Sequence, residues 1–442
     1  MSFDQAQRYL DSLGVDAMKT KARSIHRIEA MCEVLDHPER SIPAVHITGT
    51  NGKSSTARIA TSLLAATGLS VGTYTSPHLS SVTERIALSG EPISEAAFGA
   101  TFERLFPYLR VVEKELDETL SYFEVLTAMF FLWAVETPVD ALVVEVGLGG
   151  TWDATNVVPA AVAVITNVGL DHTGLLGAER VDIAREKAGI IKANVDVVTG
   201  ERDPAVLSVI EDAAARSAAS VARIERDFSV SDNRVALGGR FVSVRTSSAD
   251  YEGMFLSLHG RHQAVNAAVA LEATSRFLPA QPLDREIVQD GLGNVDAPGR
   301  LETVTLEDSG GVRVVFDVAH NPDAMSALVA GLVETLAFER VRFVVGVLAD
   351  KDYRGMLAEM TRLPCTLVVT APKSVRAVDP EDLKVAAKEL GLDGVVVADV
   401  GRAMEGAVGT AREGDIVCVT GSHYVVGEAR AQLVDVSGGL GD

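Results

Sequence analysis

The stretch that decides the fold is Ala44-Val-His-Ile-Thr-Gly-Thr-Asn-Gly-Lys-Ser-Ser-Thr56. An apolar run ends in a glycine-rich loop, a lysine follows, and the residues after the lysine have the composition of a helix. A phosphate-binding loop needs this order, because glycines let backbone N–H groups point inward, a helix N-terminus attracts anions and a lysine reaches the outer phosphates. Only two residues separate Gly49 from Gly52, whereas the common pattern has four. The stretch therefore predicts a shortened phosphate loop, unless its glycines merely serve a turn with positive φ.

Three runs of apolar, largely β-branched residues indicate parallel strands that are buried on both faces. Each run is followed by glycine or polar residues, and longer helical segments separate the runs, as in α/β architecture. Because the carboxyl ends of parallel strands share one edge of a sheet, ligands should bind at that edge. The runs are residues 42–48, 139–146 and 160–166.

Acidic and histidine side chains follow these runs at the same predicted edge. Glu145 lies at the end of the second run, and Asp171 and His172 come shortly after the third. A carboxylate there is a hard oxygen ligand for magnesium, beside a hydroxyl of Ser54 or Ser55. Without the phosphate loop, Glu145 would fit a helix cap or a local ion pair, and a lone histidine is more often structural. The convergence of three strand ends favours a magnesium–nucleotide site.

The glycines after Glu145, in Gly147-Leu-Gly-Gly150, resemble part of a dinucleotide-binding fingerprint. That motif opens a helix, but Thr151-Trp-Asp-Ala-Thr-Asn156 has the composition of an irregular loop. The pattern therefore argues against an oxidoreductase.

The chain is long enough for more than one domain, and its pattern changes along its length. Residues 228–258 predict a small antiparallel flap, a helix is expected at 263–276, and Asp296-Ala-Pro-Gly-Arg300 is typical of a hinge. Beyond the hinge, strands and helices alternate again, which indicates a doubly wound domain. We expect an α/β fold with a P-loop-type ATPase domain and its parallel sheet at 1–297, and a Rossmann-like domain at 298–442. The expected strands of the second domain are 312–318, 341–347, 366–370, 394–398 and 415–420.

Composition restricts the class of partner. The chain has 442 residues, a formal charge of −21 and a pI near 4.9, so it repels nucleic acid and anionic membranes at long range. Small anionic ligands remain compatible, because a local cluster of lysine, magnesium and helix N-termini acts within a Debye length. The longest apolar run, 126–135, is too short to cross a bilayer and predicts a buried helix. Residues 1–10 show no leader pattern and the three cysteines no metal or disulfide pattern, so we expect a cytoplasmic protein.

A set of motifs, taken together, resembles a known family. The motifs resemble those of folylpolyglutamate synthase and its bifunctional relative dihydrofolate synthase, the folate branch of the Mur ligase superfamily, whose own ATP loop is shortened in the same way. The resemblance implies an ATP-dependent ligase that phosphorylates the γ-carboxylate of a folate and then joins the acyl phosphate to L-glutamate. The motifs run in order over most of the chain: TGTNGKSS (48–55), TSPHLSSVTERI (75–86), EVGLGGTWDATN (145–156), TNVGLDHTGLLG (166–177), REKAGIIK (185–192), HQAVNAAVA (262–270), PGRLE (298–302) and DVAHNPDA (317–324).

The resemblance also implies roles for individual residues, but no general base for the glutamate amine. The implied catalytic residues are Lys53, Lys187 and His320, and the implied ATP contacts are Thr50, Asn51, Gly52, Lys53, Ser54, Ser55, Asn266, Arg300 and Asp317. The implied ligands of two magnesium ions are Ser76, Glu145 and His172. The implied substrate contacts are Pro77, His78, Thr83, Arg85, Asp153, Ser422 and His423, although a helix cap is equally compatible with Ser422.

Lys187 has no special feature in the sequence alone, where it would be a solvated helix lysine. In the family resembled, the matching lysine carries a carbamate, which replaces an ammonium with an anion able to interact with magnesium or to orient the acyl phosphate. Carbamylation requires an uncharged amine, so the resemblance implies a depressed pKa for Lys187. It also implies that ATP lies between the two domains, whose closure completes the site.

Two other classes of protein fit parts of the pattern. A peptidoglycan Mur ligase carries a UDP-binding domain ahead of its ATP loop, and too few residues precede the loop here. A nucleotide-driven switch would explain the loop and Glu145, but not the segment around Lys187 or a second domain bearing Asp317 and His320. We therefore expect a monomeric enzyme with small-molecule partners only, which extends folate tails and also glutamylates dihydropteroate.

Overall fold

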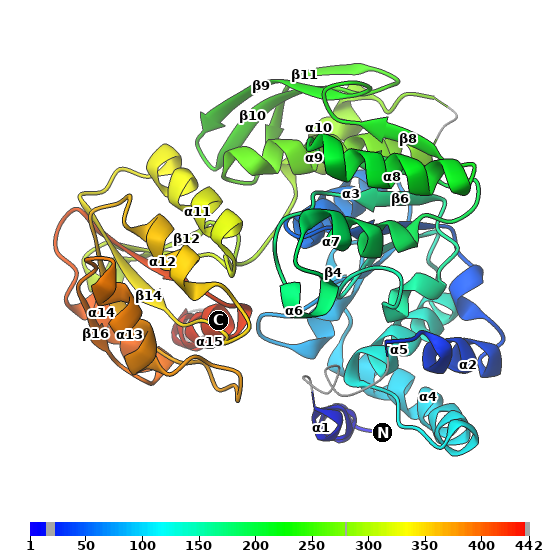
Figure 1. The fold of residues 1–442 in the computed structure, drawn as a ribbon, viewed down its shortest axis with the longest axis horizontal. Helices are drawn as coiled ribbons and strands as arrows, with labels where there is room; N and C mark the ends of the chain where they lie inside the picture. The colour runs from blue at the N-terminus through cyan, green and yellow to red at the C-terminus, as the bar shows by residue number, and fades with distance from the viewer. Residues whose placement is uncertain (15–22, 279–280, 438–442) are drawn as a thin grey trace.

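The larger lobe is built on a mostly parallel sheet with helices on both faces (Figure 1). The structure, a computed structural model, describes residues 1–14, 23–278 and 281–437. The strand order is β4-β3-β2-β5-β1-β6-β7-β8, parallel from β2 to β8, with β3 and β4 as an antiparallel edge hairpin. The three predicted strands are confirmed as neighbours β5, β1 and β6. The bounds are β1 Ala44–Thr48, β2 Val71–Tyr74, β3 Ile86–Leu88, β4 Glu91–Pro92, β5 Ala141–Glu145, β6 Val162–Ile165, β7 Asp196–Thr199 and β8 Ser220–Arg223.

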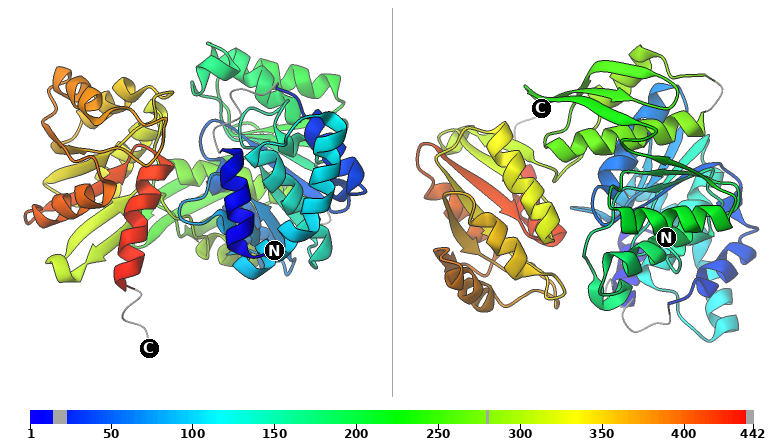
Figure 2. Two further views of the ribbon diagram at one scale, coloured as in Figure 1. Left: turned by 90° about the horizontal axis from the view of Figure 1, so that it is seen from below. Right: turned by 45° about the horizontal axis from the view of Figure 1, so that its top comes forward.

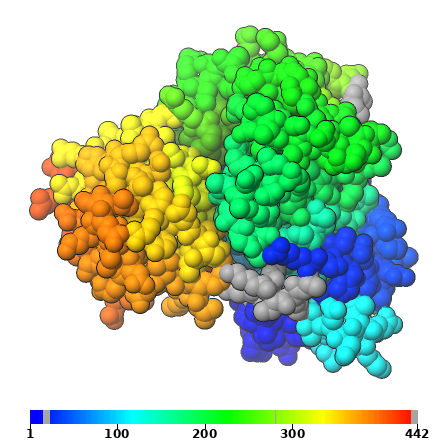
Figure 3. Space-filling model, in the orientation of Figure 1, coloured from blue at the N-terminus to red at the C-terminus, as the bar shows by residue number. Residues whose placement is uncertain are grey.

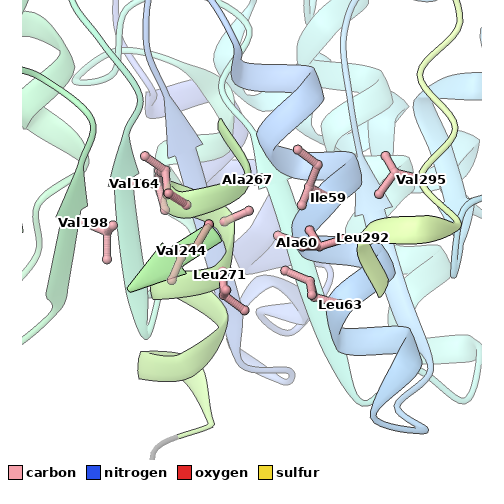
Figure 4. Packing of buried hydrophobic residues seen from close by; sticks show 14 of the residues in the cluster. Ile59, Ala60, Leu63, Val164, Val198, Val244, Ala267, Leu271, Leu292 and Val295 are labelled. Atoms are coloured by element: carbon pink, nitrogen blue, oxygen red, sulfur yellow. The ribbon is translucent and has the colours of Figure 1, made fainter. Parts of the chain in front are cut away.

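Alternate side chains of these strands pack against different helical layers. Val45 and Ile47 of β1 belong to a cluster with α3, α9 and α10, whereas Ala44 packs with α5 on the opposite face. Figure 4 shows the first cluster, in which Ile59 and Leu63 of α3 lie beside Leu292 of α10. The first face carries α3 Lys53–Ala66, α9 Arg261–Phe277 and α10 Arg285–Gly293. The second carries α1 Phe3–Leu13, α2 His26–Val34, α4 Glu95–Leu116, α5 Tyr122–Glu136, α7 Arg180–Lys187 and α8 Pro204–Arg216, with short α6 Thr173–Leu176 beside α7.

The predicted buried helix at 126–135 is confirmed as part of α5. This helix begins with a capping box between Ser121 and Glu124, and nearly all of its side chains are buried, as expected for a helix that is apolar on every side. In the described part of the chain, no helix combines the length and the apolar character needed to cross a membrane.

The predicted flap is confirmed as an antiparallel sheet of order β11-β10-β9, with β9 Ser229–Ala236, β10 Gly239–Arg245 and β11 Asp250–Leu256. It packs on α9 and α10 at the top of the larger lobe in Figure 1. The sequence pattern did not predict α10. Short 3-10 turns occur at 38–40, 82–85, 154–157, 188–190 and 307–309.

The C-terminal lobe is a doubly wound sheet of order β12-β13-β17-β14-β15-β16. Helices α11, α12 and α13 pack on one face, and α14 and α15 on the other. The five predicted strands are confirmed, but the structure adds β12 Glu302–Leu306 as an antiparallel edge. Asp317 therefore follows the second strand of this sheet, not the first. The bounds are β13 Val312–Phe316, α11 Pro322–Thr335, β14 Arg340–Val345, α12 Tyr353–Met360, β15 Cys365–Val369, α13 Pro380–Glu389, β16 Gly394–Val396, α14 Val400–Gly409, β17 Asp415–Thr420 and α15 His423–Ser437.

The two lobes lie side by side (Figures 2 and 3). The segment after α10 joins them, and the flap also contacts the C-terminal lobe. Arg240 of β10 has a fully buried side chain and donates from both terminal nitrogens to Glu334 of α11, at 2.8 and 3.2 Å. Arg261 at the start of α9 donates to the same carboxylate at 2.9 Å, but its side chain is mostly exposed. A buried ion pair thus joins the flap to the C-terminal lobe.

We expect Arg240→Met to destabilise the protein by about 3 kcal/mol, because breaking a buried ion pair leaves a charge without its partner. The value lies at the low end of the usual range, since Glu334 keeps Arg261 and is 16% exposed. The matched control Arg261→Met removes the exposed arginine from the same carboxylate and should cause a much smaller loss. Urea unfolding of both variants measures the difference, and equal losses would contradict the assignment.

Candidate active site

The carboxyl edges of both sheets face one cavity of about 630 Å³, a size typical of small-molecule sites. Loops that follow β1, β5 and β6 line it from the larger lobe, and loops that follow β13, β14 and β17 line it from the C-terminal lobe. Every residue predicted as catalytic, ATP-binding or metal-binding lies in its wall: Thr50, Asn51, Gly52, Lys53, Ser54, Ser55, Ser76, Glu145, His172, Lys187, Asn266, Arg300, Asp317 and His320.

The glycine loop after β1 depends on two glycines for different reasons. Gly52 has φ 80° directly before α3, a conformation that favours glycine. Gly49 lies so close to Thr166 that an added Cβ would stand 1.8 Å from the threonine hydroxyl oxygen. The loop therefore presents its backbone to the cavity at the N-terminus of α3, as anion binding requires.

Lys53 and Glu145 lie together at the base of the cavity. The Lys53 ammonium donates to the carbonyl oxygens of Gly49 and Thr50 at 3.1 and 3.3 Å. The Glu145 carboxylate accepts from the Ser54 hydroxyl at 2.9 Å and from the Ser76 backbone N–H at 3.1 Å. Burial raises the pKa of Glu145, and the nearby Lys53 opposes that rise. Burial lowers the pKa of Lys53, and Glu145 opposes that change.

Lys187, at the end of α7, is a buried lysine rather than a solvated one. Only 3% of its surface is exposed, and its ammonium donates to the carbonyl of Gly49 at 2.7 Å. Burial, and then the charge of Lys53, lower the pKa of Lys187 to about 7. A substantial fraction of the amine is therefore uncharged at neutral pH.

Asn266 and Gln263 lie one helical turn apart on α9 and cover the glycine loop. The Asn266 amide donates to Gln263 at 2.9 Å, and the Gln263 amide donates to the Ser55 hydroxyl at 3.3 Å. An added Cβ on Gly52 would stand 2.6 Å from the Asn266 amide oxygen. The pair forms a polar wall beside the phosphate loop.

Arg300 and Asp317 bring opposite charges to the cavity from the C-terminal lobe. The Asp317 carboxylate accepts from the backbone N–H groups of Leu301 and Ala319, both at 2.9 Å. Burial raises the pKa of Asp317 to about 6, although the Arg300 charge opposes the shift. Burial lowers the pKa of Arg300, against the effect of Asp317.

Asp171 of the larger lobe contacts several residues of the C-terminal lobe inside the cavity. It accepts from Lys351 at 2.6 Å and from the Asn321 amide at 3.3 Å, and it lies 3.5 Å from the Nε2 atom of His320. Burial alone would raise the pKa of Asp171, but His320 and Lys351 hold it well below its usual range. Asn321 also donates to Asn51 of the phosphate loop at 2.9 Å. The loop after β13 is thus hydrogen-bonded to the phosphate loop across the cavity.

The predicted substrate residues divide into two groups. Pro77, Ser422 and His423 line the cavity, and Ser422 also caps α15 by accepting from the N–H of Val425 at 3.2 Å. The other four lie outside the cavity wall and are held by other protein groups. His78 accepts from Arg85, Thr83 pairs with the Ser81 hydroxyl, and Asp153 accepts from Leu148 and Thr155. The roles of all seven in substrate binding stay predictions.

The sequence interpretation missed several residues of the cavity. Lys351 and Arg376 line it, and Asp350 lies beside them. Ala349-Asp-Lys-Asp352 comes shortly after β14, so the strand-end reasoning that found Asp171 could also have found this cluster. Gln263 could have been found from its helical spacing to Asn266.

The donor set suits a hard cation that takes most of its ligands from elsewhere. The described residues contain no cluster of three or more His, Cys, Asp or Glu side chains placed to hold a metal ion. Glu145 offers a buried carboxylate next to the phosphate loop, and magnesium at phosphate sites typically uses one or two carboxylates with phosphate oxygens and water. The residues present therefore fit magnesium bound together with a nucleotide.

Comparisons with known proteins agree on one family. A model of the Mur ligase middle domain matches residues 47–274, and a model of the Mur ligase glutamate ligase domain matches residues 299–423. The dihydrofolate synthase/folylpolyglutamate synthase of Mycobacterium tuberculosis is 41% identical over 382 residues, which cover 83% of this chain and 78% of that protein. The structure of M. tuberculosis folylpolyglutamate synthase complexed with ADP and AMPPCP has a TM-score of 0.91 at 37% identity, covering 97% of this chain and 98% of that one. Escherichia coli FolC in complex with DHPP and ADP has a TM-score of 0.85 at 31% identity, covering 99% and 98%.

Proposed function

Because this chain belongs to the Mur ligase family, in the branch of the dihydrofolate synthases and folylpolyglutamate synthases, we propose that it is an ATP-dependent ligase adding L-glutamate to the γ-carboxylate of folates. The observation that carries the proposal is the convergence, in one cavity, of a phosphate loop and Lys187 from one lobe with Arg300 and Asp317 from the other. We extend the proposal to dihydropteroate as a second acceptor, since relatives named dihydrofolate synthase match most of the chain.

The reaction needs activation because a carboxylate is a poor electrophile. A γ-carboxylate oxygen of the folate attacks the γ-phosphorus of ATP, and the bond from that phosphorus to the bridging oxygen breaks. ADP is the leaving group, and the folate becomes an acyl phosphate. The amine nitrogen of glutamate then attacks the acyl carbon, loses a proton and expels phosphate. Phosphoryl transfer depends on positioning and charge neutralisation rather than on protein nucleophiles. A cavity rich in lysine, arginine and backbone N–H groups suits that demand.

Each lobe supplies a different part of the nucleotide site. In the larger lobe, Lys53 and the N-terminus of α3 neutralise the outer phosphates, and Asn266 lies on the adenine side of the loop. In the C-terminal lobe, Arg300 contacts phosphate and Asp317 accepts from a ribose hydroxyl. Because these groups belong to different lobes, approach of the lobes completes the site and excludes water.

Magnesium and a carbamate complete the proposal. Ser76, Glu145 and His172 would hold magnesium, which when bound neutralises the phosphate charge and orients the transferring group. The buried amine of Lys187, with its pKa lowered to about 7, suits reaction with carbon dioxide to form a carbamate and release a proton. The buried, uncharged form supports this modification, which a solvated ammonium would not undergo as readily.

The test is incorporation of labelled glutamate with ATP and magnesium, run in parallel on tetrahydrofolate and on dihydropteroate. Incorporation into both supports the bifunctional proposal, and incorporation into tetrahydrofolate alone restricts it to tail extension. ATP hydrolysis without incorporation into either would refute the folate assignment and favour a ligase for another carboxylate or a nucleotide switch.

The role of Asp317 predicts a pH dependence of nucleotide affinity. Its pKa of about 6 lies above the ordinary value of 3.8, so the carboxylate becomes an ionised acceptor only as the pH rises through about 6. If the ionised form accepts from the ribose, lowering the pH from 7 to 5 should weaken ADP binding by about tenfold. Calorimetry measures the Kd for ADP as a function of pH in wild type and in Asp317→Asn. The variant lacks the titrating carboxylate, so any pH dependence that it retains comes from the titration of ADP itself. Equal slopes in both proteins would contradict the role.

A further inference from the structure

Two consecutive residues of the C-terminal lobe contact opposite ring nitrogens of His172 in the larger lobe. The Lys351 ammonium lies 3.0 Å from Nε2, and an Asp350 carboxylate oxygen lies 3.6 Å from Nδ1. Lys351 is deeply buried, with 5% of its side chain exposed, and it is anchored by Asp171 at 2.6 Å. Side chains of the other lobe therefore contact His172 on both sides of its ring.

The chemistry of the two contacts fixes the state of the ring. An ammonium can only donate, so the contact with Lys351 occupies the lone pair on Nε2 of His172. The N–H is then on Nδ1, where it faces Asp350. A histidine that binds a metal through one nitrogen usually donates the other N–H to a carboxylate, which orients the ring. Asp350 stands in that orienting position, although it belongs to the opposite lobe.

Asp350 is itself held in a way that leaves one oxygen for His172. Arg376 donates to Oδ1, whereas Oδ2 is buried and has no hydrogen-bond partner among the described residues. A buried carboxylate oxygen without a partner is costly, so a donor is expected there when the site is in use. The Nδ1 atom of His172 lies 3.6 Å from this oxygen, so its N–H can serve as that donor.

The backbone of His172 is held next to Asp171. It adopts a left-handed conformation with φ 49°, and its N–H donates to the Asp171 carboxylate at 2.8 Å. Because Nε2 has a single lone pair, a metal ion and the Lys351 ammonium cannot both bind it, and one must leave when the other binds.

We propose that Asp350 and Lys351 together control metal binding at His172: the Lys351 ammonium occupies the metal-facing lone pair in the empty cavity, Asp350 orients the ring from behind, and the metal enters by displacing Lys351. The inference rests on the proposed function, which makes His172 a metal ligand. Displacement leaves the ammonium beside Asp171 in the cavity wall, available to an anionic oxygen of the reactants. Metal entry and the contact between the lobes are thereby coupled through adjacent residues.

The experiment measures Mn²⁺ binding to the full chain saturated with ADP, by calorimetry and by the electron paramagnetic resonance signal of free Mn²⁺. The proteins are wild type, K351M, H172A, the double variant K351M/H172A, and the control K388M, which removes an exposed lysine of the same lobe. Loss of the competing charge-assisted hydrogen bond should tighten Mn²⁺ binding by about tenfold in K351M. In the H172A background the same change should have an effect of less than about twofold, because the shared lone pair is gone.

The double variant separates direct competition from a general charge effect. Equal tightening with and without His172 would overturn the proposal, since it would show that Lys351 acts only through its charge. Unchanged Mn²⁺ affinity in K351M would overturn it as well. K351Q, which keeps a hydrogen-bond donor for Asp171 without the charge, should also tighten binding and replaces K351M if the latter fails to fold.

Asp350 provides an independent readout. D350N should weaken Mn²⁺ binding by about tenfold, as expected for the partner that orients a metal-binding histidine, and should have no effect in the H172A background. An equal effect in both backgrounds would contradict the orienting role. If the proposed function itself fails, wild type will not incorporate glutamate and H172A will not change Mn²⁺ binding, whereas failure of the present inference leaves both results intact.

Discussion

Lys187→Ala should lower the kcat of ligation by about a thousandfold, which is the usual effect of removing one group that stabilises a transition state. The reason is that Lys187 is the buried amine with a pKa of about 7 next to the phosphate loop, where a carbamate would stand beside the acyl phosphate. Nucleotide binding should be largely retained, because Lys53 and the backbone of the glycine loop are unchanged. Rates of glutamate incorporation and the Kd for ADP measure the two effects separately.

Three companion experiments make the result specific to the carbamate. Lys187→Arg keeps a positive charge but cannot form the carbamate, so it should be as inactive as the alanine variant. Short-chain carboxylic acids should partly restore the alanine variant by replacing the missing anion. Arg185→Ala changes an exposed residue of the same helix that pairs with Asp182, and it should leave the rate near that of wild type. Full activity in Lys187→Ala would remove this residue from the mechanism.

The lowered pKa of Lys187 also predicts how the rate of ligation changes with pH. Because the pKa of Lys187 is lowered from 10.5 to about 7, the uncharged fraction rises as the pH increases from 6 to 8. Carbamate formation, and with it the rate, should increase over that interval when bicarbonate is supplied. The carbamate itself is measured by carbon-13 NMR of protein equilibrated with labelled bicarbonate.

Glu145→Gln is the second large effect, with an expected loss in kcat of about a hundredfold to a thousandfold, typical of removing an electrostatic group at a phosphoryl-transfer site. The carboxylate is buried between Ser54, Ser76 and Lys53, so an amide of the same shape removes the charge without leaving a void. The expected signature is a higher magnesium concentration for half-maximal activity as well as a lower rate. Magnesium titrations of glutamate incorporation provide both values.

A matched variant distinguishes a local role from a change in net charge. Glu136→Gln removes an exposed acid that pairs with Arg104 at the end of α5, away from the cavity. It should have the magnesium dependence of wild type. If Glu145→Gln also had that dependence, Glu145 would not be a metal ligand, and its burial beside Lys53 would be explained by charge balance alone.

Local pattern was sufficient for most of the fold because the buried strands carry their own signal. The runs that became β1, β5 and β6 are continuous and apolar, and the glycines after β1 are required by conformation and close approach. The strand β12 was missed because it does not carry this signal. Its residues alternate between half-buried and exposed at the edge of the sheet, so it lacks the apolar run that marks a central strand.

The candidate site was predictable where one strand end supplied the residue, and not where two lobes had to meet. The sequence by itself determined the phosphate loop, the strand ends that bear Glu145 and His172, and the family to which the motifs belong. Only the tertiary structure decided that Lys187 is buried, which lowers its pKa to about 7, and that Asp350 and Lys351 reach His172 from the other lobe. The reason is that burial and charge pairing depend on which surfaces come together across the cavity. His172 and Lys351 are nearly two hundred positions apart, so no local sequence pattern indicates that they are in contact.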